Sequence, residues 1–290
     1  MIDAEKGNME SGRTSEELKL LLAEAKAEFR HVIKVAIAAK NAAANTQTDR
    51  PGDIADVLAL RNILAAISIN QLLEPTAVAG IPALSSPDPL SISVLVRSIA
   101  ETHLTLYGVA CLAVPTEESE LRLLWWDWHE LNERIRTRDM IKSQKPGVEK
   151  WDNEKTVLAQ RISSHPTFAK LPDDLKSWFN KGERPRRATF ETTRKLAELA
   201  GIHPERFESL YQVTSAAAHA EPTVVGLLRP HEPNNEAIVS SIKLQVSFAT
   251  AFLAFTVRDF ALLAPKADEA FDGQFRKIVF VWSQVLSKPF

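Results

Sequence analysis

The 290-residue sequence lacks several features that mark particular classes of protein. Its single cysteine, Cys111, lies inside an apolar run, which argues against a framework of disulfides. The formal net charge is only −2, so no strong overall field attracts nucleic acid or an acidic membrane. The first residues lack the basic start and apolar core of a signal peptide. The apolar run at 90–114 is interrupted by charged residues, and the run at 244–257 is too short to cross a bilayer. We therefore expect a cytoplasmic protein with no membrane partner.

What the sequence does contain is helical periodicity. Apolar residues recur every three to four positions, and no alternating strand pattern has a useful length. We expect an all-α fold, a single multi-helix bundle of long antiparallel helices covering 14–290 as one domain, after a disordered tail at 1–13. A crossover rich in proline and glycine is expected at 74–88, and an irregular insertion with one or two short helices at about 143–188. The predicted helices cover about 14–44, 53–73, 88–114, 116–142, 189–200, 204–220, 236–263 and 267–287.

The helix predicted at 88–114 carries two charged residues in an apolar setting. Asp88 is the expected N-cap, and Pro89 suits the first helical position because its missing N–H costs nothing there. Arg97 and Glu101 lie four residues apart and so share one face of the helix. A buried Arg and Glu are costly unless they are paired. They are either a charged pair lining a buried site or a structural ion pair that sets the helix register.

The helix predicted at 204–220 carries a polar stripe. Tyr211, Ser215 and His219 recur every four residues, so all three can face one groove. A Ser one turn before a His suits nucleophilic or acid–base chemistry, although such catalysis also needs an orienting acid. The other interpretation is a polar seam between packed helices. We expect the helix at 88–114 to lie at the centre of the bundle against the helix at 204–220, so that this stripe meets Arg97 and Glu101 in one cluster.

Three further patterns are candidates for function. Basic residues gather near 181–195, and within that group Arg184, Arg186 and Arg187 are the candidate contacts to phosphate or nucleic acid. The same pattern is also typical of a solvated surface. His129 and Glu133 share a helix face, but nothing converges on them, so we expect no metal and no cofactor. Trp126 points away from the predicted buried stripe, which favours a subunit contact and leaves a homodimer open.

The motifs resemble those of two families. The spacing of Arg97 and His103 is similar to the arginine-to-histidine spacing of the helical HEPN ribonucleases, although six positions turn a helix by about 240° and separate the two side chains. Residues 55–225 resemble a bacterial family of unknown function that carries an R-x-x-x-E helix and a Y-x-x-x-S-x-x-x-H helix. The second resemblance implies an all-helical domain and no particular activity.

These observations leave three classes of function open. The first is a nuclease-like or phosphate-handling effector in stress or phage defence, with His219 as general acid/base, Glu101 as its partner and Arg97 on phosphate. Tyr211 and Ser215 complete that candidate site, and its partner is RNA or another phosphate-containing ligand. The second class is a ligand-binding or sensor module. The third is an interaction scaffold in which the same cluster is structural.

Overall fold

The described part of the chain folds into helices. The computed structural model describes residues 15–44, 46, 48–74, 87–141, 149–182, 187–219, 221, 236–271 and 273–289, and no strand occurs among them. The predicted all-α bundle is therefore confirmed. The expected tail at 1–13 and most of the crossover expected at 74–88 lie outside these residues. The elements are α1 (Ser15–Ala43), α2 (Arg50–Leu72), α3 (Pro89–Leu106), the π-helical turn η2 (Tyr107–Cys111), α4 (Thr116–Met140), α5 (Glu149–Ser163), the 3₁₀ turn η3 (Phe168–Lys170), α6 (Asp173–Asn180), α7 (Thr193–Leu199), α8 (Pro204–Ala218), α10 (Glu236–Leu263), α11 (Pro265–Glu269) and α12 (Gly273–Val285).

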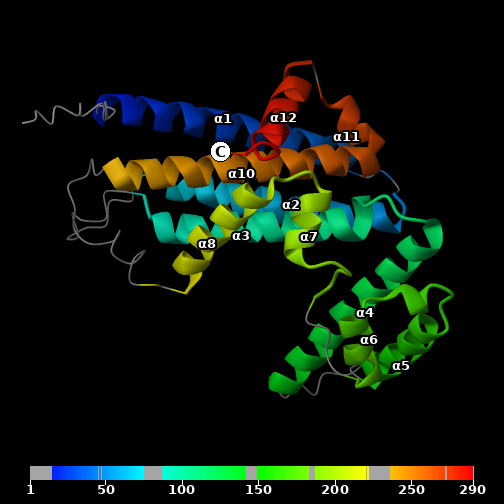
Figure 1. Ribbon diagram of the computed structural model, residues 1–290. Helices are drawn as coiled ribbons and strands as arrows, with labels where there is room; N and C mark the ends of the chain where they lie inside the picture. Colours follow the sequence, from blue (N-terminus) through cyan, green and yellow to red (C-terminus); the bar gives the residue numbers. More distant parts are fainter. Residues whose placement is uncertain are drawn as a thin grey trace, which may run out of the picture.

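The larger part of the molecule is built around α10. This helix packs against α1, α2, α3 and α12, and Phe248 to Val257 are buried without a break. A helix that is apolar on every side belongs in a core. Figure 1 shows α1, α3 and α10 side by side, with α2 running in the opposite direction. We call α1, α2, α3, α7, α8, α10, α11 and α12 the main bundle. The sequence favoured 88–114 as the central helix, but α10 is the more enclosed of the two.

Local sequence explains most of the helix ends. The Asp88 carboxylate accepts hydrogen bonds from the backbone N–H groups of Leu90 and Ser91, as expected of an N-cap. Gly201 follows α7 with φ +83°, the left-handed conformation that glycine adopts without strain. The predicted start of α2 at Asp53 is wrong by three residues. Asp49 caps this helix by accepting from the Gly52 N–H, while Asp53 accepts instead from the Thr48 hydroxyl.

A second hydrophobic core lies beside the main bundle. The helices α4, α5 and α6, which we call the lobe, enclose Trp125, Trp128 and Leu175, all of them almost fully buried. The centre of the Trp128 ring lies 4.9 Å from the centre of the Phe179 ring and 5.2 Å from that of the Trp125 ring. Figure 1 shows the lobe extending from one end of the main bundle. The insertion, expected to be irregular with one or two short helices, holds α5 and α6 of the lobe.

Several contacts of α4 attach the lobe to the main bundle, among them an ion pair between Asp127 and Arg50 of α2. Trp126 packs against the core of the main bundle, so its predicted role as a subunit contact is not needed to explain it. The Arg122 guanidinium binds Glu191 at 2.5 Å and Glu118 at 2.8 Å, and it donates to the Gly108 carbonyl at 3.2 Å. Only 5% of the Arg122 side chain is exposed, whereas the side chains of Glu118 and Glu191 are 22% and 19% exposed, so the cation is enclosed and the carboxylates keep some contact with water.

The C-terminal segment differs from the single helix expected at 267–287. It forms the short helix α11, which begins at Pro265, and then α12, which packs on α10. Proline fits the first turn of a helix, so Pro265 starts α11 as well as ending α10. Within the described residues, α10 alone has the length and apolar composition to cross a membrane. In this structure 61% of that apolar window is buried inside the protein.

Candidate functional site

The helices α3 and α8 bring three of the predicted site residues into direct contact. On α3, the Arg97 Nε donates to Glu101 Oε1 at 2.9 Å, which is the expected pairing one turn apart. From α8, the Tyr211 hydroxyl accepts a hydrogen bond from Arg97 Nη2 at 2.7 Å. The Arg97 guanidinium carbon also lies 4.5 Å from the centre of the Tyr211 ring. Together these contacts hold the guanidinium on three sides. We call Arg97, Glu101 and Tyr211 the α3–α8 cluster.

The expectation that this pair is buried is wrong. The Arg97 side chain is 21% exposed and the Glu101 side chain 46%, so the α3–α8 cluster lies at the surface. Tyr211 is 38% exposed. The physical reason is that α10 and α2 bury a different face of α3, through Ile92, Val96 and Ile99. A surface position makes the ion pair itself worth little to stability, and it leaves the guanidinium within reach of a ligand.

Ser215 and His219 continue along α8 away from this cluster. Ser215 is half-buried, and His219 is exposed at the end of the helix, where its backbone N–H donates to the Ser215 carbonyl at 3.0 Å. Eight residues of helix separate Tyr211 from His219, a rise of about 12 Å. Within the described ranges, no side-chain hydrogen bond or ion pair joins Ser215 or His219 to the α3–α8 cluster. The five predicted residues thus form an extended row.

His103 occupies an environment very different from that of Arg97. Its side chain is fully buried and lies against the rings of Phe252 and Phe255 on α10. Burial lowers the pKa of His103 to about 4, although the nearby Asp259 carboxylate, 3.8 Å away, acts in the opposite direction. Burial also raises the pKa of the neighbouring Cys111 thiol. Arg97 and His103 therefore face different helices and do not share a site.

The predicted basic contacts divide into two sets. Arg184 and Arg186 lie outside the described residues. Arg187 binds both oxygens of Asp174, at 2.6 and 3.2 Å, and donates to the Phe190 carbonyl. Its hydrogen bonds lower the pKa of the Asp174 carboxyl. A phosphate would have to displace Asp174 to bind Arg187, so in this conformation Arg187 holds the lobe together.

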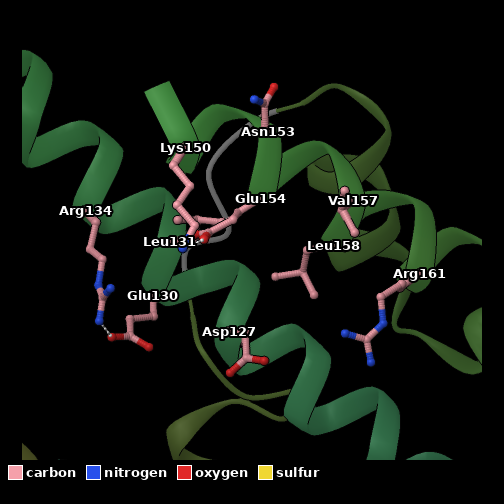
Figure 2. Close-up of a pocket in the computed structure, with 10 residues that line it drawn as sticks. All are labelled: Asp127, Glu130, Leu131, Arg134, Lys150, Asn153, Glu154, Val157, Leu158 and Arg161. Atoms are coloured by element: carbon pink, nitrogen blue, oxygen red, sulfur yellow. Dashed lines mark hydrogen bonds and ion pairs between the residues drawn. The ribbon is translucent and has the colours of Figure 1, made fainter. Parts of the chain in front are cut away.

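The lobe also carries a groove that sequence analysis did not anticipate. It lies between α4 and α5 and has a volume of about 440 Å³ (Figure 2). Its charged residues mostly pair within one helix, as Arg134 does with Glu130 and Lys150 with Glu154. Arg161 also lines it, and in Figure 2 its side chain extends from α5 into the space beside α4. Arg161 falls inside the segment read as irregular, so no sequence signal placed it here.

The described residues contain no group of three or more His, Cys, Asp or Glu side chains that converge as metal ligands. Comparison of the chain with protein-family models, curated proteins and solved structures finds no match. The α3–α8 cluster, with its partly exposed guanidinium, and the row of Ser215 and His219 along α8 are therefore the strongest basis for a functional conclusion.

Proposed function

We propose that this protein binds a phosphate-bearing ligand, with single-stranded RNA as the leading class, on the surface of α3 and α8 around Arg97. The observation that carries the proposal is the bracing of one guanidinium by a carboxylate, a hydroxyl and an aromatic ring. Arginine binds phosphate through a planar fork of N–H groups, and a fork that is already positioned loses less conformational entropy on binding.

The hydrogen-bond inventory of the α3–α8 cluster leaves donors for an anion. The Tyr211 hydroxyl accepts from Arg97, so its own O–H remains able to donate. Arg97 Nη1 has no hydrogen-bond partner within the described part of the chain. One phosphate oxygen placed beside the cluster would accept from both groups, and hydrogen bonds from a charged donor are the stronger kind.

The polar residues along α8 add groups that could catalyse a reaction on a ligand bound at this surface. Ser215 lies one turn beyond Tyr211, and the exposed His219 lies two turns beyond it. We assign His219 the role of general acid/base on a bound RNA, which requires a ligand that spans about 12 Å of helix. An RNA-cleaving effector in stress or phage defence is the activity that such binding would serve.

Glu101 has two opposing effects on an anionic ligand. Its carboxylate positions Arg97, but its negative charge repels the ligand. Binding of a fluorescent single-stranded RNA is measured by anisotropy over a range of salt concentrations. We expect Arg97→Gln to weaken binding at least tenfold and to reduce the salt slope by about 0.7, the value for one phosphate contact on a single strand. Glu101→Gln should tighten binding, because it removes a repulsive charge.

The matched control is Arg136→Gln, which removes the same charge from a lobe arginine whose side chain is 49% exposed. Equal affinities of Arg97→Gln and Arg136→Gln would contradict the proposal. In RNA degradation assays, loss of cleavage in His219→Ala with unchanged binding would support its role as acid/base. If the wild type and His219→Ala degrade RNA equally, the catalytic part of the proposal fails while the binding part is judged by Arg97→Gln.

A second candidate function is an interaction scaffold in which the cluster is only structural. The observation that favours it is that Arg97, Glu101 and Tyr211 satisfy one another across the α3–α8 contact. Under this alternative, replacing both Arg97 and Glu101 by Leu should leave the fold intact or stabilise it, since such pairs contribute little to stability. RNA binding should then be unchanged in the double variant.

A further inference from the structure

A second groove adjoins the one between α4 and α5, at the junction of the main bundle and the lobe. It has a volume of about 340 Å³, and Arg161 lines both grooves. Arg50, from the first turn of α2, reaches it from the main bundle. Leu123 and Leu124, both buried, form its apolar floor. This volume is at the low end for small-molecule sites, so the groove suits a compact ligand.

The charges in this groove are not balanced pair by pair. Arg50 forms an ion pair with Asp127 on α4. Arg161 is exposed and has no ion-pair partner within the described ranges. Partial burial and the nearby Arg161 guanidinium lower the pKa of Arg50, which means that the two cations repel each other. An anion between them would remove this repulsion, and the apolar floor would strengthen its attraction to both.

His165 adds a third donor to the same groove. Its Nδ1 accepts from the Thr167 backbone N–H at 3.3 Å, so the neutral ring carries its proton on Nε2. The Glu120 carboxylate lies 3.9 Å from Nε2, but its side chain is 65% exposed, at the solvent side of the groove. A ligand anion can therefore replace Glu120 at His165 without leaving a buried carboxylate unpaired.

We propose that this groove binds a compact phosphoryl anion through the guanidinium groups of Arg50 and Arg161 and the Nε2–H of His165. The site is separate from the α3–α8 cluster. Phosphate-type ligands fit it because they offer several acceptor oxygens to the donors of three residues that line one groove, and arginine forks match their geometry. Inorganic pyrophosphate and the phosphates of a nucleotide share this chemistry.

Binding here would couple the two parts of the molecule. Arg50 belongs to the main bundle. In the lobe, Arg161 lies in α5 and His165 comes just after that helix. An anion held by all three cross-links the main bundle to the lobe, in addition to the contacts of Trp126 and Arg122. A ligand that binds only the assembled state stabilises that state by mass action. The ligand should therefore protect the lobe from local opening.

The test uses the full chain with pyrophosphate as the probe, in isothermal titration and in hydrogen exchange of the segments 149–163 and 173–180. We expect saturable binding and slower exchange of both segments. Arg161→Gln should weaken binding at least tenfold. It is an exposed side chain, so the variant should fold. Arg134→Gln is the matched control, because Arg134 is an exposed arginine of the adjoining groove that pairs with Glu130, and its affinity should stay unchanged.

Several outcomes decide the proposal. Glu120→Gln should tighten binding, and Arg97→Gln should leave pyrophosphate binding intact, which separates this site from the RNA-binding proposal. If ATP binds more tightly than pyrophosphate, the phosphoryl group belongs to a nucleotide. If the two bind equally, the free anion is the ligand. Absence of binding by both probes, or equal weakening by Arg161→Gln and Arg134→Gln, would overturn the proposal.

Discussion

The main bundle and the lobe are stabilised in different ways. The core of the main bundle is spread over long helices and consists of aliphatic and phenylalanine side chains around α10. The core of the lobe is far smaller and depends on two adjacent tryptophans and the rings around them. The lobe compensates with charged contacts at its edges, such as Arg122 with Glu191 and Arg187 with Asp174. A small core leaves each large side chain with a greater share of the stability.

The two parts also differ in where they hold polar groups. The main bundle encloses His103, which has no hydrogen-bond partner for either ring nitrogen among the described residues and is held neutral among aromatic rings. It also encloses Asn62, whose Nδ2 donates to the Ile99 carbonyl and the Thr256 hydroxyl, while its Oδ1 has no partner among the described residues. The lobe instead places its charged side chains at its boundary. We therefore expect the two parts to respond differently to mutation, acid and salt.

The largest expected effect comes from removing one ring from each core. Trp125→Ala and Phe252→Ala each remove a fully buried ring, and each should lower the free energy of unfolding by about 3–5 kcal/mol. Hydrogen exchange shows which helices each substitution destabilises. Trp125→Ala should speed exchange in α4 to α6 while α10 stays protected, whereas Phe252→Ala should speed exchange throughout the main bundle. Identical exchange maps would show that the two cores unfold as one unit.

The next effect is acid destabilisation of the main bundle through His103. Its pKa is about 4 in the folded protein and about 6.5 in the unfolded chain. Between these values the unfolded chain binds the proton and the folded protein does not, so stability falls as the pH drops from 6.5 to 4. The full loss is about 3 kcal/mol, from a shift of about 2.5 units at 1.36 kcal/mol each.

Urea unfolding at several pH values measures this loss. His103→Leu has no titrating ring, so its stability should fall less over the same range. Carboxylates with lowered pKa, such as Asp174 and Asp268, also cause acid loss, but they are present in both proteins and cancel in the difference. Parallel pH profiles for the two proteins would rule out His103 as the source.

The boundary of the lobe gives a smaller effect. Arg122→Met removes an enclosed cation and leaves Glu118 and Glu191 unpaired, which should cost about 2–3 kcal/mol, since both carboxylates retain some contact with water. Arg134→Met is the matched control, because Arg134 pairs with Glu130 at the same spacing but at an exposed site. It should cost about 0–0.5 kcal/mol in denaturant unfolding. Similar costs at the two positions would remove the distinction between them.

The smallest effect concerns two glycines with positive φ. Gly182 follows α6 in the lobe with φ +66°, and Gly201 follows α7 in the main bundle with φ +83°. A Cβ at either position meets no atom within 4 Å, so substitution by Ala strains only the backbone. Each variant should lose about 1 kcal/mol. Thermal unfolding measures the size of the loss, and hydrogen exchange shows where it occurs. For Gly182→Ala, faster exchange should be confined to the lobe, and faster exchange in α10 would contradict this prediction.

Local signals account for the parts of the fold that the sequence predicted. Asp88 and Pro89 start α3, His203 and Pro204 start α8, and Gly201 ends α7, because capping depends on residues within a few positions. The start of α2 was wrong because two aspartates compete to cap it. Asp49 takes that role, and Pro51 falls in the first turn, where proline is tolerated.

The candidate site was predicted only in part. The spacing within one helix correctly predicted the pairing of Arg97 with Glu101. The polar stripe on α8 correctly predicted the contact of Tyr211 with Arg97. Exposure was misjudged, because an apolar sequence around Arg97 does not reveal which face of α3 the other helices cover. The groove at Arg50 and Arg161 was missed, because those residues lie 111 positions apart in the sequence and carry no shared pattern.

The sequence by itself determined that the chain forms helices, where most of them begin and end, and which residues on each share a face. These properties follow from capping, periodicity and backbone preferences that act over a few residues. Only the tertiary structure decided that Arg97 is partly exposed, that His103 is buried against α10, and that Trp126 and Arg122 attach a separate core. Burial depends on which helices pack together, and that is set by contacts between residues far apart in the chain.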